Sequence, residues 1–289
     1  MEIKKNKGLS IIIPCYNEYP EVLNQSIDEI RNIMNTVNDW DFEIIVVDDG
    51  SKKFNYEFPK HEKLKICRHE ENAGYGRALK TGIKNSQYDW IAITDADGTY
   101  PNNCLPAFTQ ICEKYDMVVG SRSWNDISLI RRFPKMILTK FASYLANYKI
   151  IDLNSGMRVF RKEIALEFWK LFPSGFSFTS TITIACITNG YTIKYLPIQY
   201  AKRQGKSHIN PIKDTYRFFS LVTRLTLYFS PLRVFFPLSV FFTLLAVGRG
   251  IRDYILLGQL GGMCLVLFFM AFQVFFFGLI AEIITKTRK

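Results

Sequence analysis

The feature that most constrains this chain is its apolar C-terminal part. Apolar segments run from Val234 to Gly248 and from Ile255 to Ile284, and a short hairpin with Arg249, Arg252 and Asp253 separates them. A helix needs about 20 mostly apolar residues to cross a bilayer, and the second segment exceeds that length. The pattern predicts a transmembrane hairpin. The alternative is a buried helical pair inside a soluble protein.

Basic residues flank the two apolar segments and set their predicted orientation. Lys286, Arg288 and Lys289 follow the second segment, and a basic stretch from Lys213 to Tyr228 precedes the first. Because Lys and Arg favour the cytoplasmic side, both flanks are expected in the cytoplasm. The stretch from Lys213 to Tyr228 also mixes its charges with Phe, Leu and Val at helical spacing. This predicts a helix in the membrane interface, with an ordinary amphipathic core helix as the alternative.

The first part of the chain has the pattern of an α/β fold. Short β-branched runs alternate with segments of helical period between Leu9 and Ser121, which predicts a mostly parallel sheet with flanking helices. Strands are predicted at 9–14, 42–48, 64–68, 90–95 and 116–121, and helices at 21–37, 74–86 and 105–114. Open α/β sheets bind ligands at the carboxyl ends of their strands, so polar residues there are the candidates for a site.

The remainder of the chain is less regular. Helices are predicted at 131–148, 162–171 and 179–189, a polar turn at 152–158 and a strand at 192–197. We therefore expect an α/β domain over residues 1–210, an interfacial helix over 211–230 and a transmembrane hairpin over 231–289. The N-terminal residues do not have the pattern of a signal peptide, so the α/β domain is expected in the cytoplasm, at the inner membrane or its equivalent.

The net charge of +11 predicts an anionic partner, which is a nucleic acid, an acidic membrane surface or a phosphorylated substrate. The apolar tail favours the last two. Nucleic acid is disfavoured because the basic residues cluster near the apolar segments rather than in an aromatic-lined groove. The six cysteines have no metal-like spacing and are expected to be reduced and structural. The three scattered histidines are expected to be surface residues.

A pair of acidic residues is the central candidate for chemistry. Asp95 and Asp97 follow an apolar strand, and alternation in an extended segment puts both carboxylates on one side. Two close carboxylates repel unless a cation joins them, and such hard oxygen ligands suit Mg²⁺ or Mn²⁺ that also holds substrate phosphates. Thr99 offers a further oxygen nearby. The alternative is a solvated acidic turn.

Further motifs accompany the acidic pair in a fixed order, namely PxYNE at 14–18, DDGS at 48–51, NxGxGxA at 72–78, DAD at 95–97 and GSR at 120–122. In this order they resemble the inverting glycosyltransferases of family 2, which have the GT-A fold. The glycines at 74–76 lack the third glycine of a dinucleotide fingerprint. The resemblance implies a nucleotide-sugar donor, and it implies that the donor site contains Pro14, Tyr16, Glu18, Asp49, Ser51, Arg77, Asp95 and Ala96.

A narrower resemblance comes from the second half of the chain. Residues 152–158 are similar to the DxxSGxR element of dolichol-phosphate mannose synthases and related polyprenyl-phosphate glycosyltransferases, and residues 203–207 look like their RxxGxS loop. The hairpin after an interfacial helix is similar to the bacterial members of this group, in which tetramers occur. The resemblance implies a polyprenyl-phosphate acceptor. The residues expected at its phosphate are Arg122, Arg131, Ser155, Arg158, Arg203, Lys206 and Ser207.

The absence of an evident catalytic base agrees with a phosphate acceptor. A hydroxyl acceptor needs a base because its proton is poorly acidic, and the sequence has no QxxRW motif and no clear acidic base. A phosphate is already ionised, so positioning and charge neutralisation can suffice. We therefore expect Asp95, Asp97, Arg122 and Arg158 to be catalytic. The alternatives are transfer to a hydroxyl of a glycan and a non-catalytic membrane module that binds nucleotide-sugars.

Overall fold

The structure is a computed structural model that describes residues 7–123, 129–175, 177–201 and 211–287; the side chains of 129–135, 137–138 and 211–218 are outside this description. Its centre is a seven-stranded sheet in the order β3-β2-β1-β4-β6-β5-β7. The strands are β1 (Lys7–Cys15), β2 (Trp40–Asp48), β3 (Leu64–Arg68), β4 (Trp90–Ile93), β5 (Met117–Arg122), β6 (Arg158–Arg161) and β7 (Ile193–Ile198). All pairs are parallel except those of β6, which runs antiparallel to β4 and β5.

Helices cover both faces of this sheet. On one face lie α1 (Pro20–Met34) and α3 (Leu105–Cys112), and on the other lie α2 (Tyr75–Asn85), α5 (Lys162–Glu167) and α6 (Phe178–Thr188), with short 3₁₀ turns at Asn102–Cys104 and Trp169–Leu171. In β1, Ile11 and Ile13 belong to the first core and Ile12 to the second, and all three are fully buried. A strand covered on both faces needs such a continuous apolar run. The predicted mostly parallel α/β fold is therefore confirmed.

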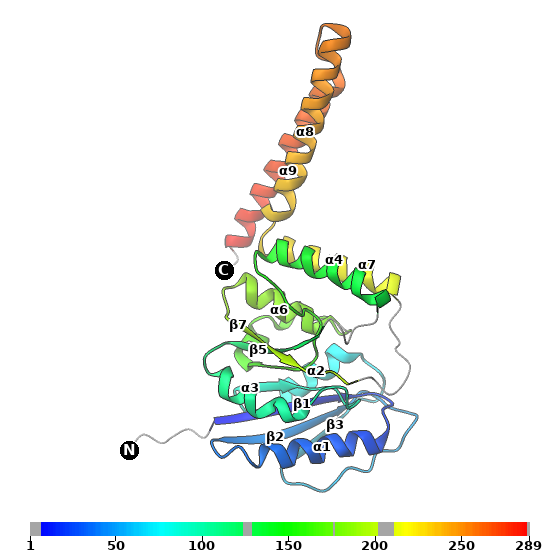
Figure 1. Cartoon of the computed structure of the whole chain (residues 1–289), viewed down its shortest axis with the longest axis vertical. Coiled ribbons are helices and arrows are strands. Elements are labelled where there is room, and N and C mark those ends of the chain that lie inside the picture. Colours follow the sequence, from blue (N-terminus) through cyan, green and yellow to red (C-terminus); the bar gives the residue numbers. More distant parts are fainter. Residues whose placement is uncertain (1–6, 124–128, 176, 202–210, 288–289) are drawn as a thin grey trace, which may run out of the picture.

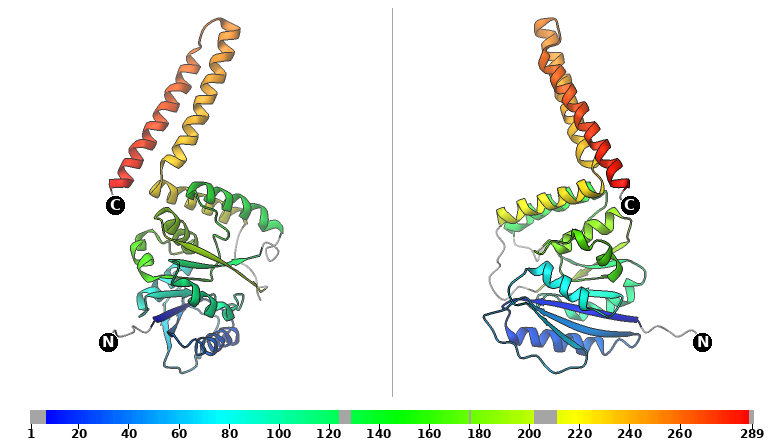
Figure 2. Two further views of the ribbon diagram at one scale, coloured as in Figure 1. Left: turned by 60° about the vertical axis from the view of Figure 1, so that its left-hand side comes forward. Right: turned by 180° about the vertical axis from the view of Figure 1, so that it is seen from behind.

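A further pair of helices forms a layer between the α/β body and the C-terminal hairpin. Helices α4 (Leu129–Ala146) and α7 (Pro211–Phe229) lie side by side across the end of the body in all the views (Figures 1 and 2). They pack on α6 through a small core that includes Leu145, Ile184, Val222 and Leu225. Phe141 of α4 stacks on Phe219 of α7, with ring centroids 4.6 Å apart. This layer fixes where the hairpin leaves the body.

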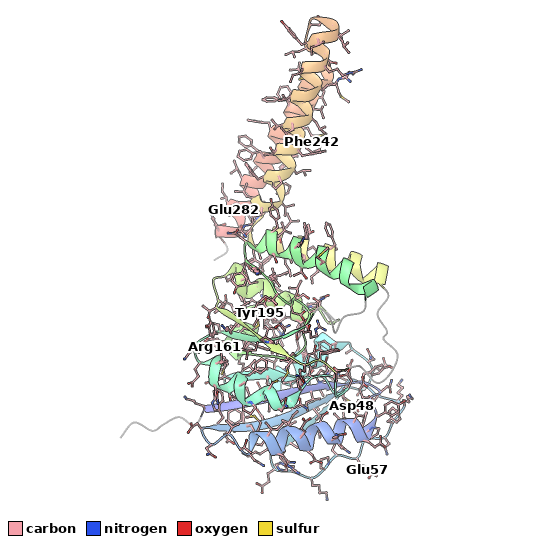
Figure 3. All side chains as sticks on the ribbon, viewed as in Figure 1. Asp48, Glu57, Arg161, Tyr195, Phe242 and Glu282 are labelled. Carbon is pink, nitrogen blue, oxygen red and sulfur yellow. The ribbon has the colours of Figure 1, made fainter. Side chains whose placement is uncertain are left out.

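The C-terminal hairpin consists of α8 (Leu232–Leu257) and α9 (Gly262–Thr287), which project from the body (Figure 1). In the apolar windows of these helices only 17% and 11% of the residues are buried. Aromatic side chains such as Phe241, Phe269 and Phe277 are more than half exposed. A helical pair in the core of a soluble protein would bury this surface, whereas lipid tails cover it in a membrane. Figure 3 shows side chains extending outwards along the whole hairpin.

The structure corrects one expectation about these elements and adds one strand. Arg249, Arg252 and Asp253 do not form the turn of the hairpin but lie within α8, where Arg249 and Asp253 pair one helical turn apart at 3.1 Å. The helix ends at Gly258, which has a φ of 68° that favours glycine. Strand β6 was not predicted, because its four residues follow a polar turn and carry arginine at both ends.

Candidate active site

The carboxyl ends of β1, β2 and β4 meet at one edge of the sheet, because the three strands are adjacent and parallel. The acidic motifs therefore occupy neighbouring loops, as the sequence predicted. Asp48, the last residue of β2, marks this edge (Figure 3). Its carboxylate is buried and accepts a hydrogen bond from the Ser51 backbone N–H at 3.0 Å. The loop after β2 is thus folded back onto its own strand.

The acidic pair lies in the turn that follows β4. Asp95 and Asp97 are both partly buried, and Ala96 between them is buried. The Tyr75 hydroxyl donates to Asp95 Oδ1 at 3.0 Å. Asp97 Oδ1 accepts from the Thr99 hydroxyl at 2.6 Å and from the Thr99 backbone N–H at 3.1 Å. Each carboxylate is therefore held in a defined orientation by a neighbouring hydroxyl.

These residues fit a divalent cation. Hydrogen-bonded carboxylate oxygens are the ligands that Mg²⁺ and Mn²⁺ prefer, and the main chain at Gly156 leaves room for the Asp95 carboxylate, because an added Cβ would lie 3.0 Å from its Oδ2. Within the described part of the chain, no group of at least three His, Cys, Asp or Glu side chains forms a metal cluster. Such an open site suits a metal that takes its remaining ligands from water and substrate phosphates.

The loops after β1 and β2 are joined by Asn17, which the sequence analysis did not single out. Its backbone N–H donates to Ser51 Oγ at 2.8 Å, and its side-chain oxygen accepts from the backbone N–H groups of Lys52 and Lys53. Asn17 has a φ of 54°, a left-handed conformation that Asn tolerates better than most residues. The Ser51 hydroxyl thus stabilises the loop itself, beside the proposed donor pocket.

Asp49 holds the neighbouring glycine loop through several hydrogen bonds. Its side chain is 4% exposed, and its Oδ1 lies 2.6 Å from Nδ1 of His69. The same carboxylate accepts from the backbone N–H groups of Ala73 and Gly74 at 3.0 and 2.8 Å. Asp49 thus tethers the glycine loop to β2, and its expected contact with the donor stays a prediction. The expectation that His69 is a surface residue is wrong, since its Nε2 contacts Thr81 at 2.8 Å.

The glycine motif serves close packing at the start of α2. The backbone N–H groups of Gly76 and Arg77 donate to the carbonyl oxygens of Gly175 and Ser174, both at 3.1 Å. A Cβ at Gly74 would lie 2.6 Å from the Ser174 carbonyl oxygen, and Gly74 has a φ of 97°. The first N–H groups of a helix are free to bind an anion only when nothing else caps them. Here the 173–175 segment caps them, which agrees with the rejection of a dinucleotide fingerprint.

We expect Gly76→Ala to destabilise the α/β domain. Its Cβ would lie 2.2 Å from the Pro173 carbonyl oxygen and 2.7 Å from that of Gly175, and overpacking of this kind costs about 1–3 kcal/mol. Thermal unfolding of the purified protein measures the loss. Gly175→Ala is the matched control, because an added Cβ there meets nothing within 4 Å. Equal melting temperatures for the two variants would contradict the proposed packing.

Arg122 lies near the acidic pair but is already paired. It binds Asp152 through two hydrogen bonds, from Nε at 2.8 Å and from Nη2 at 3.0 Å, and Asp152 is fully buried. The guanidinium also lies 5.4 Å from the ring centroid of Tyr200, which packs on Tyr100. Asp152 was not named as a site residue, although it begins the DxxSGxR motif. Its charge neutralises Arg122 and fixes its direction.

Arg158 and Ser155 are fully buried, and their expected contact with the acceptor phosphate stays a prediction. Arg158 lies on β6 and donates to the carbonyl oxygens of Thr179 and Ser155 and to the Thr183 hydroxyl. Burial lowers the pKa of its guanidinium, while nearby hydroxyls such as that of Tyr75 act in the opposite direction. Ser155 Oγ has no partner among the described residues. Arg158 therefore ties β6, α6 and the 152–156 turn together.

Of the other predicted site residues, some lie at the carboxyl edge of the sheet and the side chains of the rest are outside the described part of the structure. Tyr16 and Arg77 are exposed at the carboxyl edge of the sheet and Glu18 is partly buried there, whereas Pro14 and Ala96 are buried in it. Arg131 lies on α4, but its side chain is outside the described part of the structure. Arg203, Lys206 and Ser207 also lie outside it. The segment that leads to them begins at Ala201, whose backbone N–H donates to the Thr99 carbonyl oxygen at 3.0 Å.

Several proteins similar to this chain are named as dolichyl-phosphate or polyprenol-phosphate sugar transferases or synthases. A protein named dolichyl-phosphate hexose transferase from Haloferax volcanii is 26% identical over 207 residues, covering 70% of this chain and 87% of that protein. A UDP-N-acetylglucosamine–dolichyl-phosphate N-acetylglucosaminyltransferase from Methanococcus voltae is 28% identical over 251 residues, covering 75% and 96%. A polyprenol monophosphomannose synthase from Mycolicibacterium smegmatis is 24% identical, covering 70% and 80%.

Solved structures and family descriptions agree on the fold and on the family. The glucosyl-3-phosphoglycerate synthase of Mycobacterium tuberculosis, crystallised with Mn²⁺, UDP and phosphoglyceric acid, matches with a TM-score of 0.57 at 14% identity, covering 77% of this chain and 80% of that one. Residues 230–287 match the family described as the GtrB C-terminal hairpin. Residues 10–169, more than half of the chain, match the family described as glycosyl transferase family 2. The chain therefore belongs to glycosyl transferase family 2.

Proposed function

We propose that this glycosyltransferase transfers a hexose from a UDP- or GDP-linked donor to a polyprenyl phosphate, such as undecaprenyl or dolichyl phosphate, with inversion at the anomeric carbon. The main supporting observation is that Asp95 and Asp97 lie together in the turn after β4 in a chain that also has an exposed apolar hairpin. Relatives named as dolichyl-phosphate and polyprenol-phosphate transferases support the choice of acceptor.

In this proposal, different residues at the carboxyl edge of the sheet bind the metal ion and the nucleotide. Asp97, with Asp95, would hold Mg²⁺ or Mn²⁺, which would supply charge neutralisation for the diphosphate leaving group when bound. Thr99 contributes through its bond to Asp97, which orients that carboxylate. Tyr16, Glu18 and Arg77 bind the nucleotide part of the donor. The loop and core contacts of Asn17, Asp49 and Arg158 keep these groups in place.

The acceptor phosphate approaches from the membrane side in this proposal. An oxygen of the phosphate attacks the anomeric carbon, the bond from that carbon to the donor diphosphate breaks, and the nucleoside diphosphate leaves. Because the phosphate is ionised at neutral pH, no proton has to be removed from it. Arg122, whose side chain is 17% exposed, is one expected contact of the phosphate, with Arg131, Arg203, Lys206 and Ser207 as the others.

We also propose the membrane arrangement that follows from the charge pattern. Residues 1–210 form the cytosolic catalytic domain, residues 211–230 lie in the interface and residues 231–289 span the cytoplasmic membrane as a hairpin. The two flanks of the hairpin are basic, which favours the cytoplasmic side. Assembly of several copies into a tetramer remains a prediction of the resemblance.

A donor panel tests the proposed function. Membranes that contain the protein are incubated with labelled UDP-glucose, UDP-N-acetylglucosamine, UDP-galactose or GDP-mannose and a polyprenyl phosphate, with Mn²⁺, with Mg²⁺ or with a chelator. We expect label from one donor to enter the organic phase only when a cation is present. Label that enters only a water-soluble glycan would indicate a hydroxyl acceptor. Donor binding with no turnover under any condition would indicate the non-catalytic module.

A further inference from the structure

The Asp95 carboxylate is enclosed by Tyr75, at a variable position of the 72–78 motif, and by Gly156, the glycine of the DxxSGxR element. Tyr75 is the residue between the two glycines of the 72–78 motif, and its hydroxyl donates to Asp95 Oδ1 at 3.0 Å. On another side lies Gly156, where an added Cβ would be 3.0 Å from Oδ2 and 3.2 Å from Oδ1 of the same carboxylate. We propose that Tyr75 and Gly156 are positioning residues that fix the orientation of Asp95 toward the metal.

The backbone around Tyr75 explains how its hydroxyl comes to face Asp95. Gly74, with its positive φ, turns the chain into α2, and the carbonyl oxygens of Ser174 and Gly175 accept hydrogen bonds from the first turn of that helix. Asp49 binds the Gly74 backbone N–H from the side of β2 at 2.8 Å. The start of α2 is thus held from two directions. These hydrogen bonds fix the backbone at Tyr75, so the position of its Cα varies little.

The hydrogen bond from Tyr75 leaves Asp95 able to bind a metal ion. A phenol donates one proton, and an ionised carboxylate has about four lone-pair sites, so the bond from Tyr75 leaves capacity for a cation. A phenol hydroxyl is neutral at physiological pH, so in its bond to an ionised carboxylate Tyr75 is the donor. Groups that orient a metal ligand in this way commonly change metal affinity by about 10- to 100-fold when they are removed.

Gly156 has no side chain, and this leaves space for the Asp95 carboxylate. Its backbone N–H donates to the Tyr100 hydroxyl at 2.7 Å, which holds the main chain of the 152–156 turn against Asp95. Gly156 is not one of the positive-φ glycines in the described part of the chain, so an added Cβ does not meet the penalty of that conformation. A methyl group at this position would also lie 3.2 Å from Tyr100 Cε2, so the Asp95 carboxylate, the Tyr100 ring or the turn has to shift.

The test uses the full-length protein in detergent and rests on the proposed function. Binding of Mn²⁺ in the presence of UDP, or of GDP where that is the nucleotide bound, is measured by the electron paramagnetic resonance signal of free Mn²⁺. Nucleotide binding is measured separately with a chelator present. We expect Tyr75→Phe to weaken Mn²⁺ binding about 10- to 100-fold, with nucleotide binding in the chelator unchanged. We expect Gly156→Ala to have an effect in the same direction.

The matched control is Tyr88→Phe. The Tyr88 hydroxyl also donates to a carboxylate, Asp41 Oδ2, at 2.6 Å, and burial together with this bond raises its pKa to about 12. Tyr88 precedes β4 and Asp41 lies at the start of β2, so this bond is at the opposite edge of the sheet. Tyr88→Phe should therefore bind Mn²⁺ as the unchanged protein does. Gly248→Ala is the control for an added methyl group, because its Cβ meets nothing within 4 Å.

The outcomes separate this inference from the proposed function. If the unchanged protein shows no cation-dependent nucleotide binding, the proposed function fails, and the inference fails with it. If that protein binds Mn²⁺ with the nucleotide, but folded Tyr75→Phe and folded Gly156→Ala bind it equally well, only the inference is overturned. If Tyr75→Phe fails to fold, Gly156→Ala decides alone. A loss of nucleotide binding in the chelator would also contradict the inference, because it would show a role in the pocket as a whole.

Discussion

Asp97→Asn is expected to lower sugar transfer by about 10²- to 10³-fold while the protein stays folded. The amide has nearly the shape of the carboxylate, and its oxygen can still accept the bonds that Thr99 donates to Asp97 Oδ1 at 2.6 and 3.1 Å. What the variant loses is one negative charge at the proposed metal site. A weaker cation site leaves the charge of the departing diphosphate without its main source of stabilisation.

The measurement for this variant is the rate at which labelled sugar enters the organic phase, over a range of Mn²⁺ concentrations. Thermal unfolding of the purified protein checks that the fold is intact. Asp28→Asn is the control, because Asp28 is about half exposed on α1 and pairs with Arg31 one turn away. Full activity of Asp97→Asn at every Mn²⁺ concentration would remove the metal role of this residue and, with it, the central step of the proposal.

Asp152→Asn is expected to give the largest loss of stability, about 3–5 kcal/mol. Asp152 is 0% exposed and binds Arg122 at 2.8 and 3.0 Å, and the Arg122 side chain is only 17% exposed. Removing the negative charge leaves a mostly buried guanidinium without its ionic partner. The free-energy cost of that unpaired buried charge exceeds the stabilisation that the intact pair contributes. For a domain of this size the loss corresponds to a fall of roughly 6–20 °C in melting temperature.

Two further variants make the stability prediction specific. Glu113→Gln removes one member of an ion pair with Lys7, in which both side chains are nearly half exposed, and it should leave the melting temperature close to that of the unchanged protein. Combining Asp152→Asn with Arg122→Met should recover part of the loss, because no buried charge then remains unpaired. Equal melting temperatures for Asp152→Asn and Glu113→Gln would contradict this prediction. They would show that the Arg122–Asp152 pair is not buried as described.

Much of the fold could be predicted from local patterns. Strand β3 was predicted with its observed bounds, and β1, β2 and β5 within two residues at each end, because each is a short apolar run between polar turns. The hairpin was predicted from its length and composition, but its turn was placed too early. Charged residues indicate a turn only when they are solvated, and here Arg249 and Asp253 bind each other inside α8. The helix continues to Gly258.

The candidate site could be predicted in position but only partly in role. Motifs at the ends of adjacent parallel strands necessarily meet at one edge, so Asp95, Asp97 and the loops after β1 and β2 were correctly brought together. The roles of Asp49, Arg158 and Ser155 were not visible, because a sequence does not show which face of an element is covered. Strand β6 inserts between β4 and β5, and this insertion buries Arg158 against α6.

The sequence by itself determined the class of fold, the family, the acidic edge of the sheet and the exposed hairpin. Each of these follows from the order and spacing of residues along the chain, which local preferences and strand direction translate directly into structure. Only the tertiary structure decided that Tyr75 and Gly156 enclose Asp95, that His69 and Asp49 hold the glycine loop, and that Asp152 neutralises Arg122. Those partners lie between 20 and 61 residues apart in the chain. Their contacts depend on side chains that meet only after the sheet and its covering helices have packed.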